Sequence, residues 1–236
     1  MKIVAVDTST AAGSVALLQD DQVVAEWYLQ SAKTHNRRLL ASLDHVLRQA
    51  RWTLQDVDGF AVTTGPGSFT GLRIGLSTVK TLAWCLAKDF VGIPSLDALA
   101  GGLGFGHHPV CPVLDARKKE VYFGLYRPDG QGRQILQGVY LVDKPEHLVR
   151  HVTEKTIVCG DGWLLYKNQL LAKLGDLIIE APPPCHMIRA SQVGYLAMQK
   201  LSAGKGEDPV HSSPLYVRPS EAEIHRNALQ KRIRRE

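Results

Sequence analysis

The chain has 236 residues, 44% of them hydrophobic, and a formal net charge of +5, so it is long enough to bury a core in one or two domains. We expect no membrane partner, because no apolar run approaches the roughly 20 residues that span a bilayer, and residues 1–7 are too short and too soon acidic for a signal peptide. The four cysteines lie far apart without a C-x-x-C pair, which favours a reducing, cytoplasmic location and argues against disulfides or a cysteine zinc site.

Strands are predicted first along the chain. Residues 2–7 form an apolar run typical of a buried strand, and residues 13–19 and 22–29 follow as two strands around a turn at Asp20-Asp21. This pattern indicates an antiparallel meander. Apolar residues then recur at helical spacing and predict a helix over 35–50, with Thr34 as its N-cap.

A glycine-rich turn is the most informative motif. Gly65-Pro66-Gly67-Ser68-Phe69-Thr70-Gly71-Leu72-Arg73-Ile74-Gly75 follows a predicted strand at 58–64 and opens a helix over about residues 70–87. Such a turn can aim backbone N–H groups at an anion beside a helix N-terminus. The same glycines can equally let the helix pack close to another backbone.

The helix at 70–87 is apolar on more than one side, so more than one side must be covered. Either it is sandwiched inside the domain, or it packs one face on the sheet and another on a partner chain. In the second case Gly71 and Gly75, one turn apart, would let the partner come close. The partner interface that we predict from the two helices consists of Leu39, Leu40, Leu43, Leu47, Gly71, Leu72, Gly75, Leu76, Val79 and Leu82.

The second half repeats the first. Residues 110–115 again form a strand that ends in an aspartate, residues 119–127 form a return strand, and residues 156–162 lead into a helix at 163–174. A last helix covers about residues 190–203. We therefore predict an α/β fold of two βββαβα units. The N-terminal lobe at 1–105 would carry the dimerisation helices, and the C-terminal lobe at 106–236 would end in a basic tail.

This duplicated layout resembles the superfamily of actin, sugar kinases and heat-shock ATPases. One family within it is matched by four segments, which are Val6-Asp7-Thr8-Ser9-Thr10, residues 64–75, Asp115-Ala116-Arg117 with Glu120-Val121-Tyr122, and Pro214-Leu215-Tyr216-Val217-Arg218. They resemble TsaB, also called YeaZ, of bacterial tRNA threonylcarbamoyladenosine synthesis. The resemblance implies a scaffold subunit that binds and stabilises TsaD, the catalytic sibling that modifies an adenosine beside the anticodon. It also implies the small ATPase TsaE as a partner, tRNA reached through the complex, and a homodimer when the chain is isolated.

The resemblance implies that this chain is not itself an enzyme. The catalytic sibling carries a His-x-x-x-His pair that can share a metal on one helix face; the matching positions here are Ser95 and Leu99. The acidic pair of the sibling's first loop corresponds to Ala11 and Ala12. We therefore expect no catalytic residue and no metal site. His147 and His151 also lie at i and i+4, but without an evident third ligand, and are expected to be solvated surface side chains.

A nucleotide site remains as an alternative. Asp7, Thr8 and Thr10 with the turn Gly160-Asp161-Gly162 would form a vestigial nucleotide cleft, with weak ATP or ADP binding or even the activity of an actin-superfamily ATPase or kinase. Against this, Asp7 can cap its own turn through side-chain to backbone bonds, and we favour that interpretation. No other cofactor is expected.

The C-terminal tail is basic, since residues 221–236 hold five basic and three acidic side chains. A basic tail is compatible with an RNA partner without requiring one. The tail therefore either contacts tRNA or is a short amphipathic helix or disordered chain.

Overall fold

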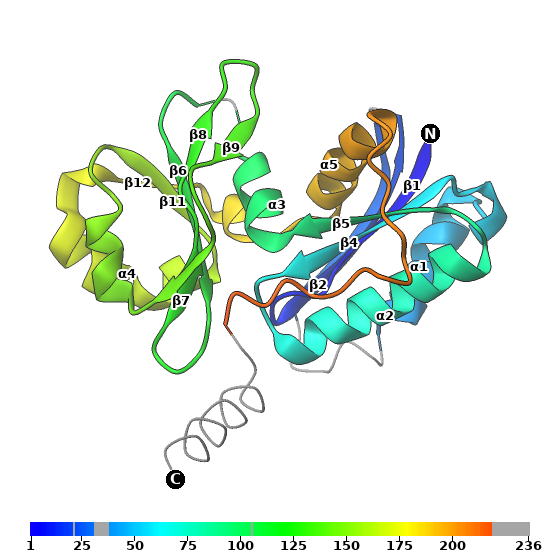
Figure 1. Ribbon diagram of the computed structural model, residues 1–236, viewed down its shortest axis with the longest axis horizontal. Coiled ribbons are helices and arrows are strands. Elements are labelled where there is room, and N and C mark those ends of the chain that lie inside the picture. The colour runs from blue at the N-terminus through cyan, green and yellow to red at the C-terminus, as the bar shows by residue number, and fades with distance from the viewer. Residues whose placement is uncertain (21, 31–37, 105, 219–236) are drawn as a thin grey trace, which may run out of the picture.

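The computed structural model describes residues 1–20, 22–30, 38–104 and 106–218. Two β-sheets with their own helices lie side by side along the long axis of the molecule (Figure 1). Thr34, the first residues of the helix predicted at 35–50 and the basic tail lie outside the described residues. Within the described ranges, no helix is both long and apolar enough to cross a membrane.

The first sheet has the strand order β3–β2–β1–β4–β5. Its strands are β1 (Lys2–Asp7), β2 (Ala12–Gln19), β3 (Gln22–Gln30), β4 (Gly59–Gly65) and β5 (Asp89–Pro94). β1 pairs antiparallel with β2 and parallel with β4, so that Val4 lies between Leu17 and Phe60. The predicted meander and the strand at 58–64 are confirmed to within one residue at each end.

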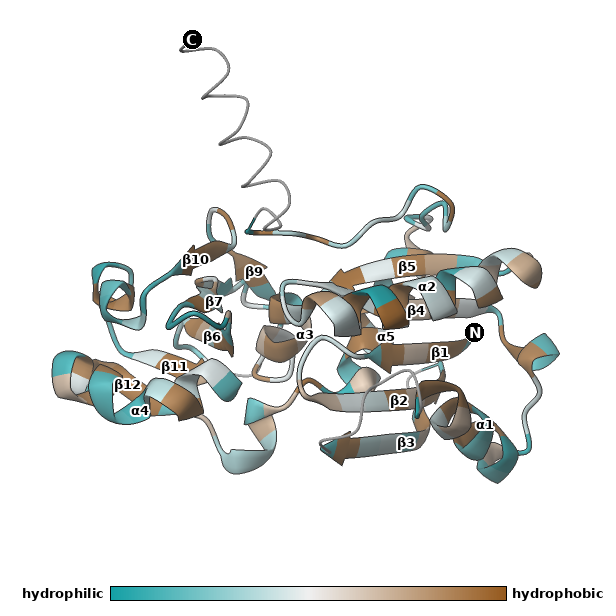
Figure 2. Ribbon diagram, turned by 90° about the horizontal axis from the view of Figure 1, so that it is seen from below, coloured by the Kyte–Doolittle hydropathy of each residue, from teal (hydrophilic) through white to brown (hydrophobic). Residues whose placement is uncertain are grey.

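Helices cover both faces of this sheet. Val4 and Val6 pack with α1 (Leu39–Ala50) and α2 (Phe69–Cys85), whereas Ile3 and Ala5 pack with α3 (Ser95–Gly101) and α5 (Ala190–Ser202). Successive side chains of a strand point to opposite faces, so a strand buried on both sides must be apolar throughout. Figure 2 shows β1 largely in brown, the hydrophobic colour.

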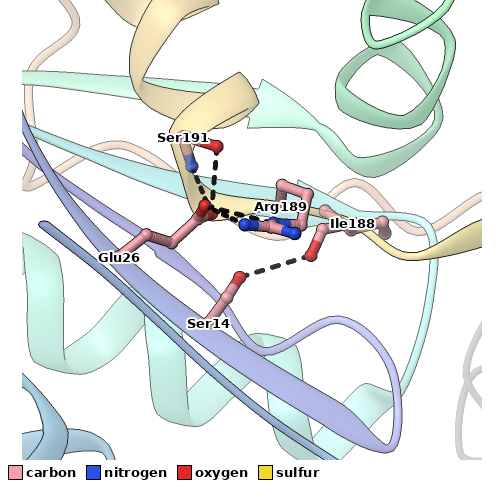
Figure 3. Close-up of polar contacts among 5 residues, drawn as sticks. All are labelled: Ser14, Glu26, Ile188, Arg189 and Ser191. Atoms are coloured by element: carbon pink, nitrogen blue, oxygen red, sulfur yellow. Dashed lines mark hydrogen bonds and ion pairs between the residues drawn. The ribbon is translucent and has the colours of Figure 1, made fainter. Parts of the chain in front are cut away.

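The last helix, α5, follows the second sheet in sequence but packs on the first, against β1, β2, β4 and β5. Figure 3 shows how its N-terminus is fixed. Glu26 on β3 accepts hydrogen bonds from the N–H and hydroxyl of Ser191, both at 3.0 Å, and from Nε of Arg189 at 3.1 Å. The Ser14 hydroxyl donates to the carbonyl of Ile188 at 3.3 Å.

The chain after α5, residues 204–218, continues along the first sheet and is called the C-terminal segment below. The N–H of Glu207 donates to the carbonyl of Phe90, and the N–H of Leu215 to that of Thr64, both at 2.8 Å. The predicted lobe boundary at residue 105 stays a prediction. The contacts show that α5 and the C-terminal segment, placed by sequence in the second lobe, complete the packing of the first sheet.

The second sheet has the order β10–β7–β6–β11–β12, with β8 pairing to β6 and β9. Its strands are β6 (Val110–Asp115), β7 (Val121–Phe123), β8 (Tyr126–Pro128), β9 (Gln134–Leu136), β10 (Leu141–Asp143), β11 (Thr156–Cys159) and β12 (Ile178–Glu180), with α4 (Asp161–Leu174) packed on β6. Short 3₁₀ segments occur at Leu54–Asp56, Pro145–Arg150, Gly175–Leu177 and Pro183–His186.

The single return strand predicted at 119–127 is wrong, because the structure divides it into β7 and β8. Both pieces pair with β6 in one register, with Val113 opposite Phe123 and Val110 opposite Tyr126. Pro112 falls opposite the gap in that register, and proline has no N–H for the ladder. Gly124 also lies at the break, and a glycine inside a strand pattern is a sign of interruption that the prediction did not use.

Candidate functional site

A cavity of about 650 Å³ lies between the two halves of the molecule and is called the cleft below. The turn after β1 and the start of α2 form one wall, and the turn after β6 with Tyr122 forms the other. Tyr216 and Arg218 of the C-terminal segment also line it. The cleft therefore collects side chains from three distant parts of the sequence.

The turn after β1 is held by the buried carboxylate of Asp7. Oδ1 of Asp7 accepts hydrogen bonds from the N–H of Ser9 at 3.0 Å, the hydroxyl of Ser9 at 2.6 Å and the hydroxyl of Thr63 at 2.7 Å. Asp7 is only 1% exposed and borders, with Thr8, a separate void of about 20 Å³ instead of the cleft. The interpretation that Asp7 caps its own turn is confirmed.

The turn after β6 has the same capping bond but faces the cleft. The N–H of Arg117 donates to Oδ1 of Asp115 at 2.8 Å, and the Arg117 guanidinium lies 3.2 Å from Oδ2. The N–H of Asp115 in turn donates to Asp161 at 3.0 Å. Burial raises the pKa of the Asp161 carboxyl, although the N–H groups of Asp115 and Gly162 oppose that shift.

Two glycine turns allow close backbone packing within each wall of the cleft. A Cβ on Gly67 would lie 2.2 Å from the carbonyl of Ser9, and one on Gly160 would lie 2.1 Å from the carbonyl of Val113. Gly162 packs in the same way against the backbone of Leu114. The glycines thus permit close backbone packing, which was one of the two uses expected for the glycine-rich turn.

The first wall of the cleft carries stacked aromatic rings. Ser68 caps α2 by accepting the N–H of Gly71 at 3.2 Å, which fixes the first turn of the helix. Phe69 on that turn stacks with Tyr216 at a centroid distance of 5.3 Å. Arg73, one turn later, lies 3.9 Å from the Phe69 ring and donates to the Tyr216 hydroxyl at 3.0 Å.

The second wall pairs an aromatic ring with an arginine from the end of the C-terminal segment. The Arg218 guanidinium lies 6.0 Å from the Tyr122 ring, donates to the carbonyl of Ala116 at 3.2 Å and forms an ion pair with Glu120. Glu120 therefore joins the C-terminal segment to the turn between β6 and β7.

The turn between β6 and β7 presents consecutive cations. Arg117, Lys118 and Lys119 all have φ between 54° and 62°, in the left-handed region, and all three are exposed. Arg117 and Lys118 line the cleft. These three residues are called the basic turn below.

Only part of the predicted nucleotide cleft comes together. Thr10 and Asp161 line the cleft, whereas Asp7 and Thr8 do not, and Gly160 and Gly162 serve backbone packing. The sequence analysis did not assign Phe69, Arg73, Tyr122, Tyr216 and Arg218 to a site. All five lie in motifs quoted for the family resemblance, which was the one signal that could have found them.

The predicted partner interface needs a correction in its residues. Leu43 and Val79 are 4% and 1% exposed and pack against the sheet inside this chain. The same holds for Leu39, Leu47, Leu72 and Leu76. Apolar residues at helical spacing form a continuous stripe on one side of a helix, and this is the side that packs on the sheet. The regular stripe therefore marks the core face of α1 and α2. Of the predicted leucines, Leu40 is 58% exposed and Leu82 is half-buried.

The two helix glycines also face this chain and not a partner. The Thr8 hydroxyl donates to the carbonyl of Gly71 at 2.8 Å, and a Cβ on Gly75 would lie 2.2 Å from that hydroxyl oxygen. The close approach that Gly75 allows is therefore between α2 and the turn after β1, and the Gly71 carbonyl binds the same turn.

Ser95 and Leu99, which the family resemblance matches to a metal-binding pair, lie inside the core. Ser95 and Leu99 on α3 are 0% and 3% exposed, and Leu99 packs among apolar side chains. His147 contacts Asp143 through Nδ1 at 2.8 Å, whereas His151 lies edge-on to Phe123 at 5.2 Å, so the two rings serve different neighbours. Among the described residues, no three His, Cys, Asp or Glu side chains gather as a metal site.

Comparison with known proteins gives three kinds of likeness. The TsaD family model, tRNA N6-adenosine threonylcarbamoyltransferase, matches residues 29–226. The tRNA threonylcarbamoyladenosine biosynthesis protein TsaB of Bacillus subtilis (strain 168) is 33% identical over 227 residues, covering 94% of this chain and 96% of that protein. YeaZ from Pseudomonas aeruginosa superposes with a TM-score of 0.80 at 30% identity, over 91% of this chain and 99% of that one.

A more distant likeness concerns the fold alone. Component A of (R)-2-hydroxyglutaryl-CoA dehydratase from Acidaminococcus fermentans aligns at 12% identity with a TM-score of 0.52, over 86% of this chain and 99% of that one. Together with YeaZ, it confirms the predicted actin-like α/β fold.

Proposed function

Because the chain belongs to the TsaB family of tRNA threonylcarbamoyladenosine biosynthesis proteins, we propose that it takes part in this tRNA modification as a non-catalytic subunit. In this role it binds a TsaD-like catalytic sibling and stabilises the active form of that sibling, with a TsaE-like ATPase and tRNA as further partners. The observation that carries the proposal is the likeness to Bacillus subtilis TsaB along 94% of the chain.

The residues at the sibling's metal positions support the non-catalytic part. A metal-assisted acyl transfer needs ligands that hold the ion beside the substrate. Leucine has no ligating atom, and Leu99 lies in the apolar core. Asp7, the carboxylate on which the ATPase alternative depends, is enclosed by Ser9 and Thr63.

The outer face of α2 supports the partner-binding part. Apart from Arg73 and Lys80, the exposed and half-buried positions of the helix from residue 73 onwards carry no charge and consist of Ile74, Ser77, Thr78, Thr81, Leu82, Trp84 and Cys85. The two cations of α2 bind the C-terminal segment instead: Arg73 donates to Tyr216, and Lys80 donates to the carbonyls of Val210 and Ser212 at 3.1 and 2.9 Å. Charged residues are depleted at the centres of protein interfaces.

Helix α1 packs on the same side of the sheet as α2 and adds another exposed apolar side chain. Leu40 on α1 is 58% exposed, and Trp84 on α2 is 66% exposed. We propose that the sibling covers α1 and α2 here, and that a second copy of this chain covers them when the sibling is absent, since related folds can share one self-complementary surface.

The test places a charge on this surface without touching the core. Leu40→Asp and Thr81→Arg should each weaken binding of the sibling at least tenfold, because a charge buried in an interface loses its hydration. Leu164→Asp on α4 is the matched control, since Leu164 is 51% exposed on the other half of the molecule. Binding is measured by calorimetry with the purified sibling, and self-association by light scattering.

Unchanged binding by Leu40→Asp and Thr81→Arg would refute the assigned surface. ATP hydrolysis by the isolated chain that is lost in Asp7→Ala protein shown to be still folded would instead establish the enzyme alternative.

A further inference from the structure

Cations outnumber acidic side chains around the cleft. Four cations line the cleft and Lys119 follows them on the basic turn, against Asp115 and Asp161 in the lining and Glu120 next to Lys119; the four are Arg73, Arg117, Lys118 and Arg218. Two of the acids are already paired, Asp115 with Arg117 and Glu120 with Arg218. The third, Asp161, accepts the N–H of Asp115. The rim of the cleft therefore favours an anionic ligand.

Aromatic rings line both walls of the same cleft. Tyr216 lies on the first wall, stacked on Phe69, and Tyr122 lies on the second wall beside the Arg218 guanidinium. Phe69 and Tyr216 are 43% and 37% exposed. Exposed rings backed by arginines are the arrangement on which unstacked nucleobases pack, since every base has a flat π-face.

The size of the cleft limits the ligand. A volume of about 650 Å³ is in the range of pockets that enclose one small molecule. It suits one unstacked nucleotide with its neighbouring phosphates on the rim, and it excludes a double helix.

We propose that the cleft binds single-stranded RNA, with one base between Tyr216 and Tyr122 and the sugar-phosphate backbone on the basic turn. This inference rests on the proposed function, because it supplies the tRNA contact that a subunit of a tRNA-modifying complex would make. An acidic peptide would also meet the cations, but it would leave the aromatic walls without a stacking partner.

The first test removes charge from the basic turn. The probe is a fluorescent 12-nucleotide oligoadenylate, and an unmodified tRNA transcript serves as competitor. The variant is Arg117→Asn/Lys118→Asn/Lys119→Asn, because asparagine tolerates the left-handed backbone of the turn. The control is Arg51→Asn/Lys155→Asn/Lys173→Asn, which removes the same charge from exposed sites away from the cleft and includes Arg51 at φ 56°.

We expect the variant of the basic turn to bind at least about tenfold more weakly, and the control to change less than about twofold. The slope of log affinity against log salt should become shallower by about 2, since each single-strand phosphate contact contributes about 0.7. The proposal would be overturned if the basic-turn variant and the control lost the same affinity for the probe, or if the basic-turn variant lost none. It would also be overturned if the wild-type chain failed to bind the probe.

The second test separates stacking from charge. Tyr216→Ala should weaken oligoadenylate binding about tenfold, in line with the stacking of one base, whereas Tyr216→Phe keeps the ring and should bind like wild type. Displacement of the probe by ATP but not by tRNA would replace the proposal with the nucleotide cleft.

Sibling binding is measured on the same variants. Weaker RNA binding together with normal sibling binding would support the RNA site independently of the sibling interface. Unchanged sibling binding by the α1–α2 surface variants would refute that interface without affecting the RNA site.

Discussion

Asp7 ends β1 and Asp115 ends β6, so the two aspartates hold the same place in the duplicated fold. Each accepts the N–H of the residue two positions later. Asp7 is then enclosed by hydroxyl groups, whereas Asp115 faces the cleft and pairs with Arg117. One local motif thus stabilises the interior in the first half and shapes a ligand-accessible wall in the second, and its surroundings decide between these roles.

The largest effect should come from removing Asp7, with the removal of Asp115 as the comparison. Asp7→Ala leaves the N–H and hydroxyl of Ser9 and the hydroxyl of Thr63 buried without their acceptor, so we expect a loss of about 3 to 5 kcal/mol in the free energy of unfolding. Asp115→Ala should cost about 1 kcal/mol, because water can reach its donors. Urea unfolding measures both, and equal losses would remove the contrast between the two turns.

A smaller effect is expected where the second half is fastened to the first. Glu26 is 9% exposed, and Glu26→Ala should cost about 2 to 3 kcal/mol because Arg189 and Ser191 at the start of α5 lose their acceptor. Glu154→Ala removes a surface pair with Arg127 and should cost less than about 1 kcal/mol. Thermal and urea unfolding would contradict this if the two variants lost the same stability.

The smallest effect concerns how the turn after β6 makes the free energy of unfolding depend on pH. Burial raises the pKa of Asp161 above 3.8, so its contribution to stability is complete below pH 3.8 and is lost as the pH rises through the folded-state pKa. Asp161→Asn keeps the acceptor for the N–H of Asp115 but does not ionise. We expect its free energy of unfolding to vary less with pH in this window, by about 1.4 kcal/mol per unit of pKa shift; parallel pH profiles would refute this.

Most helices and strands could be predicted because the spacing of apolar residues along the chain depends only on which side of each element is buried. Apolar runs and helical spacing located β1, β2, α2 and α5 to within two residues at each end. The same spacing could not say what covers an apolar stripe. Leu43 and Val79 were assigned to a partner, but the sheet of their own chain covers them.

The cleft was harder to predict because its walls meet only in the folded chain. Arg73 and Tyr216 lie 143 residues apart and are joined by a hydrogen bond. Thr10 and Asp161 were identified, since they lie in turns after predicted strands. The break between β7 and β8 falls opposite Pro112 on the neighbouring strand, and within residues 119–127 it coincides with Gly124.

The packing of α5 also constrains the order in which the protein can fold during synthesis. A nascent chain that has emerged only as far as β12 exposes Ile3, Ala5 and Val91, the face of the first sheet that α5 covers in the finished molecule. Domains usually fold from the N-terminus as they leave the ribosome. Here α5 cannot cover the sheet built first until residues 190–202 have emerged, so this apolar face is the surface that a chaperone would have to protect until then.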